Sequence, residues 1–237
     1  MAIAWVSNCV RWVGASVMND ISMIGLLAVA SLLPFLIAAG TCYIKFSIVF
    51  VIVRNALGLQ QVPSNMTLNA VALLLAMFVM SPVVQQGYDY YKENHVEFTR
   101  IDAVVDFLDN GLGGYREYLA RYTDPDLAQF FERAQIARED PGAVDSEFDE
   151  KLEPSLFALL PAYALSEIKA AFKIGFYLYL PFVIVDLVVS SILLALGMMM
   201  MSPVIISVPI KLVLFVALDG WSLLSTGLVG QYLSLAQ

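Results

Sequence analysis

The stretch at residues 197–203 reads Gly-Met-Met-Met-Met-Ser-Pro and separates two apolar segments, 174–196 and 204–219. Glycine commonly follows the end of a helix and proline commonly starts one, so the methionines are predicted to lie on a tight turn between two helices. Methionine is unbranched and polarizable, and a run of thioethers makes a surface that deforms and repacks. The run is therefore either filler at the end of a helix bundle or a soft constriction that opens and closes.

The composition of the whole chain indicates the class of protein around this turn. Of 237 residues, 59% are apolar and 14% are charged, against about 45–50% and about 25% in soluble domains. The mean hydropathy is +0.75. The apolar runs are continuous and do not alternate with period two, which favours helices over a membrane barrel. These values predict an all-α integral membrane protein.

Most of the negative charge lies in one part of the chain. Residues 85–155 hold seventeen acidic and seven basic side chains, a net charge of −10, and the rest holds four acidic and six basic ones. The acidity therefore belongs to a polar insert and not to the membrane part. The basic surface that nucleic-acid binding requires is absent from this pattern, so no nucleic-acid partner is expected.

Four regions follow from the distribution of apolar and polar residues. Residues 1–20 are predicted to be an uncleaved N-terminal arm. A secretory signal places its basic residues first and its apolar core directly after them, whereas here the only base is Arg11 and the long apolar run starts after Asp20. Residues 21–84 are predicted to form a first helical hairpin. Residues 85–155 form a small acidic insert with two or three short amphipathic helices. Residues 156–237 form a second hairpin that carries the methionine loop.

The first apolar pattern is longer than a membrane requires. As one helix, residues 21–57 would span about 55 Å, whereas the hydrocarbon core is roughly 30 Å thick. Either the helix breaks near Gly40, or much of it packs against protein. Lys45 and Arg54 favour the second interpretation for residues 41–57, because a charge that faces lipid is costly.

The turn of the first hairpin has clear sequence signals. Gly58 is predicted to end one helix and Pro63-Ser64-Asn65 to begin the next, which is expected to end at Ser81-Pro82. Lys45 and Arg54 precede this turn and no acid is near it, so the positive-inside rule places the turn on the cytoplasmic side. The acidic insert then lies outside.

The second hairpin is also overlong and carries charges. Residues 156–196 would span roughly 60 Å as one helix, and Pro161 and Pro181 are expected to kink it. Six ionisable residues lie in or beside its apolar helices: Glu167, Lys169, Lys173, Asp186, Lys211 and Asp219. Snorkelling near the helix ends is an alternative explanation for the first three. It is weaker for the two aspartates, whose side chains are short. Long helices with scattered charges predict an oligomer with a protein-lined interior.

Signals of catalysis or metal binding are missing from the sequence. No phosphate-binding loop, dinucleotide fingerprint, zinc-protease motif or nucleophile elbow is found. Cys9 and Cys42 are predicted to be buried small hydrophobes, and His95 to be solvated. The acidic run 145–150 lacks the glycine and the ligand spacing of a calcium loop, and a solvated linker is the better interpretation. No enzyme activity and no cofactor are expected, and the absence of an inverted repeat gives a secondary transporter little support.

Two long stretches carry a family resemblance. The first runs from residue 50 to residue 83 and contains Arg54-Asn55-Ala56-Leu57-Gly58, Gln60-Gln61, Pro63, Asn65 and Met80-Ser81-Pro82. The second runs from residue 167 to residue 221 and contains Ile174-Gly175-Phe176, Leu180-Pro181-Phe182, Asp186-Leu187-Val188, Gly197-Met198-Met199-Met200, Pro203, Pro209, Lys211 and Leu218-Asp219-Gly220-Trp221. In order and spacing these motifs resemble the FliP/SctR family of type III export-gate proteins, over nearly all of the chain except 1–20 and 85–155.

The segment after the methionines resembles one branch of that family. Met201-Ser202-Pro203-Val204, followed by Pro209-Ile210-Lys211, is more similar to the virulence-type injectisome branch than to the flagellar one. Flagellar members tend to carry a second proline where this chain has Ser202.

The resemblance implies an assembly in the bacterial inner membrane, with residues 85–155 on the periplasmic side of the lipid bilayer. The chain would form a homo-oligomer, a pentamer, in a helical cone with subunits of the SctS and SctT types, and it would meet a switch protein of the SctU type. Unfolded secreted proteins would pass through the centre. The residues that would seal the idle channel are Met198, Met199 and Met200, with Met201 adjacent. The charges expected in oligomer contacts or in the protein interior are Arg54, Lys169, Lys173, Asp186, Lys211 and Asp219.

Three other interpretations remain open from the sequence. The chain could nucleate assembly of the export machine while a partner forms the seal. It could belong to the flagellar branch. It could also be an autonomous ion or solute transporter. A copper(I) site made of the four thioethers is a minor alternative for the loop.

Overall fold

A computed structural model of the chain divides it into two units, Met1–Ala38 and Ala39–Gln237. The residues that the structure describes are 27, 31, 34–35, 37–94, 111–139, 155–198 and 200–233. Several features named above lie outside the described residues: the arm at 1–20 with Cys9, His95, the acidic run 145–150 and Met199. All helices with described bounds lie in the second unit.

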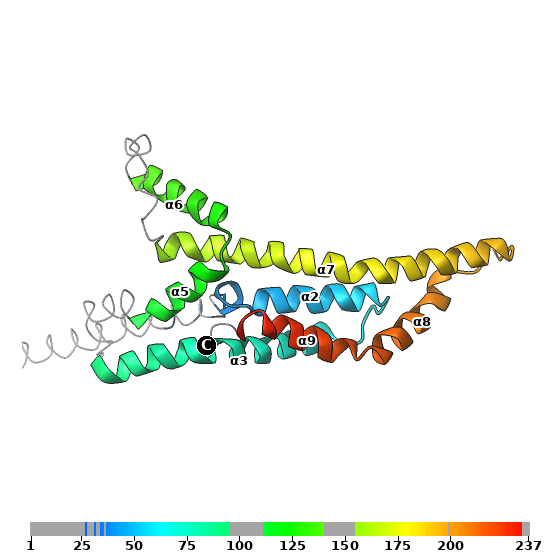
Figure 1. Ribbon diagram of the computed structural model, residues 1–237, viewed down its shortest axis with the longest axis horizontal. Helices are drawn as coiled ribbons and strands as arrows, with labels where there is room; N and C mark the ends of the chain where they lie inside the picture. The colour runs from blue at the N-terminus through cyan, green and yellow to red at the C-terminus, as the bar shows by residue number, and fades with distance from the viewer. Residues whose placement is uncertain are drawn as a thin grey trace, which may run out of the picture. The chain divides into compact units, whose positions relative to one another are not determined.

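All regular structure in the described part of this unit is helical, as predicted. In chain order the helices are α2 (Tyr43–Ala56), α3 (Asn65–Asn94), α5 (Gly113–Tyr122), α6 (Pro125–Glu139), α7 (Leu156–Ala195), α8 (Pro203–Ala217) and α9 (Gly220–Gly230) (Figure 1).

The centre of the unit is α2, which packs most extensively against α7 and next against α3. Its apolar side chains recur at spacings of three and four residues, and the buried ones are Phe46, Val49, Phe50, Val53 and Ala56. This spacing places a continuous apolar stripe on the helix. Lys45 and Arg54 of α2 are buried as well. The prediction that residues 41–57 pack against protein is therefore confirmed.

The chain also breaks directly after Gly40, where residues 41 and 42 form a bend and a turn before α2. The Tyr115 hydroxyl of α5 donates to the Gly40 carbonyl oxygen at 2.8 Å. A Cβ atom at position 40 would lie 2.3 Å from that hydroxyl oxygen, so only glycine leaves room for the contact. Both explanations offered for the overlong first pattern, a break and burial, thus apply to it.

The turn between α2 and α3 is built as its sequence predicts. Gly58 has a positive φ of +78°. The amides of Gly58 and Leu59 donate to carbonyl oxygens of the last turn of α2, at 3.0 and 3.2 Å, which is the Schellman arrangement that closes a helix. At the start of α3, Ser64 Oγ accepts from the Thr67 amide at 3.2 Å, as a helix cap does.

The predicted end of the next helix at Ser81-Pro82 is wrong, because α3 continues through Pro82 to Asn94. A proline inside a helix removes one hydrogen bond and costs roughly 3 kcal/mol. Here the preceding residues Val79 and Met80 are buried in the core, and Val83 packs against it. This packing holds both sides of the proline in helical register and offsets the local cost.

The polar insert contributes two short helices to the described structure. The two helices, α5 and α6, are separated at Thr123-Asp124, and Pro125 begins α6. The Thr123 hydroxyl donates to the Leu119 carbonyl at 2.6 Å, and the Asp124 amide donates to Ser166 Oγ of α7 at 2.8 Å. The second bond fixes the α5–α6 corner to α7.

The longest helix is α7, whose 40 residues continue through Pro161 and Pro181 without a break. Its length is about 60 Å. Within the described residues, α7 and Asn65–Tyr90 of α3 are long and apolar enough to cross a membrane. A third span results if α8 and α9, which meet at a bend of 59°, are counted as one. By length and composition, these helices support the predicted class of membrane protein.

Candidate functional site

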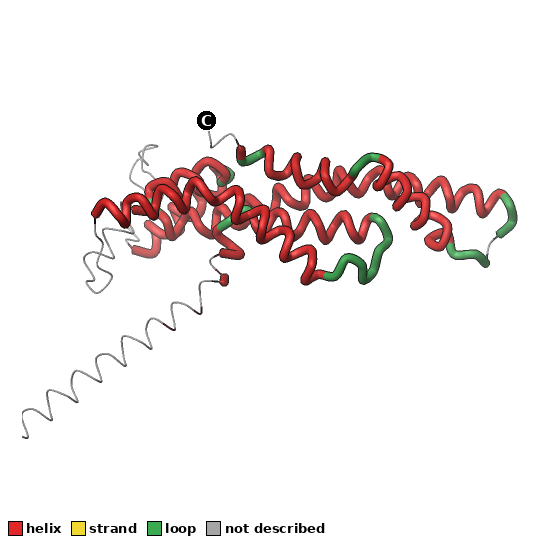
Figure 2. The backbone as a smooth tube through the Cα atoms, turned by 90° about the horizontal axis from the view of Figure 1, so that it is seen from below, coloured by secondary structure: helices red, strands yellow, loops and turns green. Residues whose placement is uncertain are grey.

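The methionine loop joins α7 to α8 and closes the second hairpin. In both Figure 1 and Figure 2 it lies at the end of α7 that points away from α6. The structure thus places the methionines at the tip of a long hairpin, on the predicted turn between two helices.

Two backbone features hold this loop. Gly197 has a positive φ of +75°, and the amides of Gly197 and Met198 both donate to carbonyls of the last turn of α7 at 3.0 Å. This is a second Schellman closure. The Met201 amide then donates to the Met198 carbonyl at 3.3 Å. Pro203 occupies the start of α8, where its missing amide donor costs no hydrogen bond.

The described methionine side chains of the loop are all exposed, Met200 completely and the other two in part. Relative exposure is 39% for Met198, 104% for Met200 and 44% for Met201. Met199 lies outside the described residues. The loop therefore offers at least three thioethers outward, where a second surface can contact them.

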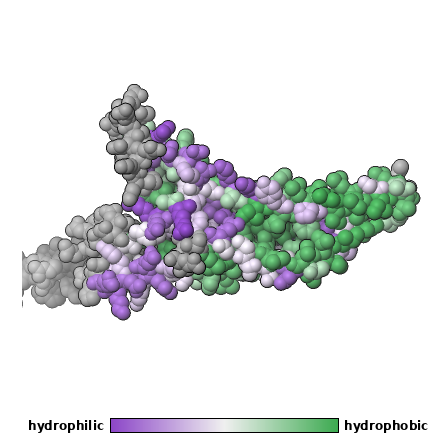
Figure 3. All heavy atoms as spheres, viewed as in Figure 1, coloured by the Kyte–Doolittle hydropathy of each residue, from purple (hydrophilic) through white to green (hydrophobic). Residues whose placement is uncertain are grey.

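The helices that flank the loop are apolar on the outside as well. Figure 3 shows apolar residues over α8 and the C-terminal half of α7. Large exposed apolar side chains there include Ile184, Leu187, Ile192, Leu194, Val204, Ile205 and Val213. An apolar surface of this extent is covered by lipid or by another protein chain in a folded assembly.

Lys211 joins three helices close to the middle of this hairpin. Its ammonium donates to Asp186 Oδ2 of α7 at 2.6 Å and to the Ala56 carbonyl oxygen at 3.1 Å. Ala56 is the last residue of α2, where carbonyl oxygens lack partners within the helix and the helix dipole favours a cation. Lys211 is buried, whereas the Asp186 side chain is 40% exposed. Lys211 thus fixes α8 against α2 and α7.

Arg54 stabilises the α2–α3 turn beside this junction. One of its terminal nitrogens donates to the Pro63 carbonyl at 3.1 Å and to Asn65 Oδ1 at 2.6 Å. A Cβ atom at Gly58 of the same turn would lie 2.5 Å from Val208 Cγ2 of α8. The turn and α8 are therefore closely packed, and the buried Arg54 serves the fold of its own chain.

A second buried ion pair was not among the predicted site residues. Lys45 Nζ lies 3.0 Å from Glu167 Oε1, and their side chains are only 6% and 2% exposed. The Tyr232 hydroxyl donates to the Glu167 carboxylate. The Lys45 ammonium lies 4.6 Å from the centre of the Tyr232 ring, a cation–π distance. This cluster joins α2, α7 and the segment that follows α9.

Tyrosines surround this ion pair. The hydroxyls of Tyr118 and Tyr163 are 2.6 Å apart, and the Tyr118 ring stacks against the rings of Tyr115 and Tyr232. Burial raises the pKa of Tyr118 well above its ordinary value and that of Tyr115 to about 12, so both hydroxyls stay protonated, and that of Tyr115 donates to the Gly40 carbonyl oxygen. The spacing of Tyr115, Tyr118 and Tyr122 puts them on one helix face, a signal that could have indicated the cluster.

The other three charges singled out from the sequence lie at the surface. Lys169 Nζ pairs with Asp124 Oδ2 at 2.6 Å, and this hydrogen bond holds the pKa of Asp124 below its ordinary value. Lys173 and Asp219 are exposed, and neither has an ion-pair partner in the part of the chain that the structure describes. Asp219 also has an unusual positive φ of +50°.

Cys42 is buried, as predicted, and burial raises the pKa of its thiol to about 12. Among the described residues, no three or more histidine, cysteine, aspartate or glutamate side chains are grouped to hold a metal ion. The features that the described residues do provide are buried ion pairs that fix helices and exposed thioethers at a hairpin tip.

Comparison with known proteins gives consistent matches along the chain. The pattern of the FliP family matches residues 26–228. The "Surface presentation of antigens protein SpaP" of Salmonella typhi is 66% identical over 221 residues, which cover 92% of this chain and 99% of the relative. The "Yop proteins translocation protein R" of Yersinia pestis is 44% identical, covering 90% and 97%. The "Harpin secretion protein HrcR" of Erwinia amylovora is 39% identical, covering 87% and 94%.

Proposed function

The chain belongs to the FliP family, and from this premise we propose that it is a core subunit of an injectisome-type protein export apparatus. The predicted family and its injectisome branch are confirmed by the relatives. Their names refer to translocation and secretion. We infer that this chain and its partners form the channel through which unfolded proteins are exported in type III secretion.

The proposed assembly is a pentamer with SctS-type and SctT-type subunits, next to a SctU-type switch protein. It lies in the bacterial inner membrane with residues 85–155 on the periplasmic side. The length of α7, about 60 Å, supports this proposal because it is twice the thickness of a bilayer core. The exposed apolar surface of α7 and α8 supports it as well, since lipid alone cannot cover so long a helix.

The methionine loop is the proposed seal of this channel. The observation that carries the proposal is the outward exposure of Met198, Met200 and Met201 at the tip of the hairpin. When several copies bring their tips together, thioethers meet thioethers and exclude water. Because these side chains are flexible and uncharged, the plug parts around a passing chain of any sequence and closes behind it.

The test replaces the thioethers and measures ion leak. In the triple variant Met198→Ala, Met199→Ala and Met200→Ala, we expect the complex to assemble and the membrane to leak small ions. The matched control is Met66→Ala with Met77→Ala, because these methionines are also exposed but lie on α3, away from the loop. Normal ion tightness in an assembled triple variant contradicts the proposed seal.

A second candidate function is a scaffold that nucleates the machine while a partner subunit forms the seal. The buried contacts of Lys211 favour it, because they fix the hairpin as a rigid support. On this hypothesis the loop substitutions abolish assembly instead of causing leak. The hypothesis of an autonomous transporter is tested with liposomes that contain this chain alone. Solute flux in these liposomes would support it, and flux that requires the partner subunits would contradict it.

A further inference from the structure

The ionisable residues of the second hairpin leave one cation and one anion unpaired. Within the described residues, Glu167 pairs with Lys45, Lys169 with Asp124, and Lys211 with Asp186. Lys173 and Asp219 remain. A charge in an apolar helix is costly unless a partner or water satisfies it. The surroundings of these two residues therefore indicate which partner each charge has in the assembly.

Lys173 lies on an exposed aromatic surface of α7, called here the outer α7 face. It consists of Phe172, Lys173, Phe176 and Tyr177, all exposed. A Cβ atom at Gly175 would touch Ile52 of α2, so position 175 faces α2. At about 100° per residue, position 173 is rotated by roughly 200° from position 175 and faces away from the chain's own core.

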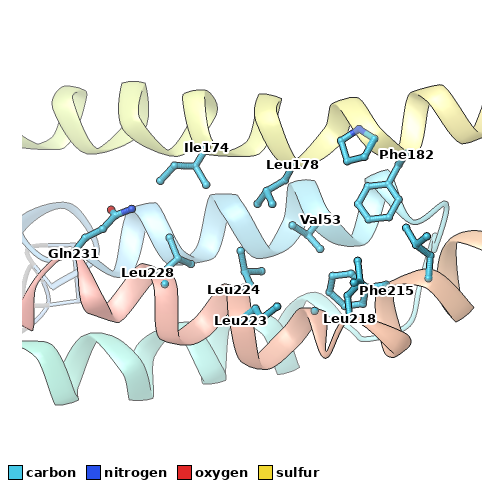
Figure 4. A pocket seen from close by; sticks show the side chains of 14 residues that line it. Val53, Ile174, Leu178, Phe182, Phe215, Leu218, Leu223, Leu224, Leu228 and Gln231 are labelled. Carbon is cyan, nitrogen blue, oxygen red and sulfur yellow. The ribbon is translucent and has the colours of Figure 1, made fainter.

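Asp219 lies on a different surface, the bend between α8 and α9, called here the α8–α9 elbow. Its apolar neighbours Val216, Leu218 and Leu223 are exposed. Leu218 and Gly220, on either side of Asp219, also line an apolar groove of about 410 Å³ between α7, α8 and α9 (Figure 4). The elbow therefore combines an apolar groove with one carboxylate next to it.

The fold of the chain itself gives the Asp219 carboxylate no bonding partner among the described residues. Residue 219 adopts the left-handed conformation that ends α8, which glycine adopts at lower cost. Its side chain makes no capping hydrogen bond to the start of α9. The carboxylate is thus retained in an unfavourable backbone conformation without a local bond to compensate.

We propose that the outer α7 face of one copy docks on the α8–α9 elbow of the next copy, with Lys173 paired to Asp219 and the adjacent aromatic rings seated at the groove. One contact then satisfies both charges, whereas a lipid phosphate would satisfy Lys173 alone. Because the two surfaces lie on different elements, the contact is head-to-tail, which builds rings or helical assemblies. Aromatic side chains beside a desolvated charge pair are typical anchors of such interfaces.

This inference rests on the proposed homo-oligomer and names the contact within it. The test reverses each charge in the full-length chain, expressed with its partner subunits, and measures the oligomer on native gels. Lys173→Glu and Asp219→Lys should each reduce the assembled fraction about tenfold. The double variant should restore assembly to at least half of the wild-type level, because the pair is re-formed with opposite polarity.

Lys169→Glu is the matched control for the reversal. Lys169 lies one turn from Lys173 on the same helix, but its partner Asp124 belongs to its own chain. Lys169→Glu alone should therefore assemble nearly as well as the wild type, and it should not rescue Asp219→Lys. Rescue of Asp219→Lys by Lys169→Glu would overturn the specific pairing, since any added negative charge on this part of α7 would then suffice.

Cysteine cross-linking tests the contact directly. In a background with Cys9→Ala and Cys42→Ala, one copy with Lys173→Cys and another with Asp219→Cys should form a disulfide dimer on oxidation. The pair Lys169→Cys with Asp219→Cys should not. If the wild-type complex assembles and exports but neither reversal nor cross-linking has an effect, the proposed contact is wrong while the proposed function stands. If the wild-type chain forms no homo-oligomer at all, the proposed assembly is itself wrong.

Discussion

The tip of the second hairpin, residues 197–203, and the remainder of that hairpin, called here the base, are held by different kinds of interaction. At the base, buried charges join separate helices: Lys45 with Glu167, and Lys211 with Asp186 and the end of α2. At the tip, the sequence has no charged residue between Asp186 and Lys211, and the loop is closed by backbone hydrogen bonds and a proline. Directional bonds fix the base, and adaptable thioethers form the tip.

This difference assigns two tasks to two parts of the hairpin: the base sets the position of the tip, and the methionines at the tip make its contacts. Buried ion pairs tolerate little displacement, because a charge that loses its partner in the protein interior is strongly unfavourable. Exposed methionines tolerate displacement well, because their side chains are flexible and uncharged. The base thus sets where the tip lies, and the tip can adjust to whatever it meets. Each of the following predictions concerns a substitution that weakens one kind of interaction and leaves the other intact.

The largest expected effect comes from Glu167→Leu, which leaves the Lys45 ammonium buried without a counter-charge. Removal of one partner of a buried ion pair costs about 3–5 kcal/mol. We expect a loss of this size in the free energy of unfolding of the purified protein, measured by denaturant titration in detergent. The double variant Lys45→Met with Glu167→Leu should be clearly more stable than the single one. A double variant that is less stable than Glu167→Leu would contradict the interpretation of the cluster as a pair.

The next effect is expected at the other buried lysine. Lys211→Met removes two hydrogen bonds from a charged donor, which we expect to cost about 1.5–3 kcal/mol in all, less than at Glu167 because the Asp186 side chain is 40% exposed and that of Glu167 only 2%. Asp186→Asn keeps the bond from Lys211 to the Ala56 carbonyl and should cost less. Equal losses in the two variants would show that the bond to Ala56 contributes nothing.

Two glycines with the same local geometry allow the base and the tip to be compared. Gly58 lies in the α2–α3 turn, which packs against α8 at the base, and Gly197 lies at the tip. Gly58 and Gly197 both close a helix with φ near +75°. Alanine at either site should lose about 1–2 kcal/mol for the left-handed backbone. At Gly58 a Cβ atom would also meet Val208, whereas at Gly197 it would meet nothing within 4 Å. Gly58→Ala should therefore be more destabilising by about 1–3 kcal/mol.

Thermal unfolding of the two alanine variants measures this difference. Val208→Ala should recover part of the loss in Gly58→Ala and none of the loss in Gly197→Ala. The comparison between base and tip would be unsupported if Gly197→Ala proved the more destabilising change.

The smallest effect concerns the exposed pair of Asp124 and Lys169. Because the hydrogen bond lowers the pKa of Asp124, the pair stabilises the fold above the ordinary carboxyl pKa of about 4. That stabilisation disappears as the pH falls through the lowered value. Asp124→Asn should remove this part of the pH dependence of the unfolding temperature and change little at pH 7, since exposed pairs are weak. A variant with an unchanged pH profile would contradict the assignment.

Much of the fold follows from local signals in the sequence. The turn after α2 was predictable because glycine adopts the positive φ that closes a helix at low cost, as Gly58 does, and because the fixed φ of Pro63 suits the start of the next helix. The interior position of α2 was predictable because Lys45 and Arg54 make a lipid-facing helix too costly. The end of α3 was mispredicted because the effect of Pro82 depends on packing by residues such as Val79, and packing partners are not visible in a local pattern.

The pairing of the charges could not be predicted from the sequence. Lys45 and Glu167 lie on helices far apart along the chain, and any of several acidic residues could have served Lys45. Lys211 and Asp186 come from the two arms of one hairpin, so their pairing depends on how the arms are staggered. The part played by Tyr232 was missed because a tyrosine near the end of an apolar helix is equally typical of a membrane interface.

The two hydrogen bonds donated by Lys211 have a consequence for the length of the methionine loop. Since α7 is closed by its own Schellman bonds and α8 is anchored to the end of α2 by Lys211, the loop does not determine where either helix lies. The loop connects the two helices but does not set the distance between them. Residues inserted between Met198 and Ser202 should therefore lengthen the loop without shifting α7 or α8.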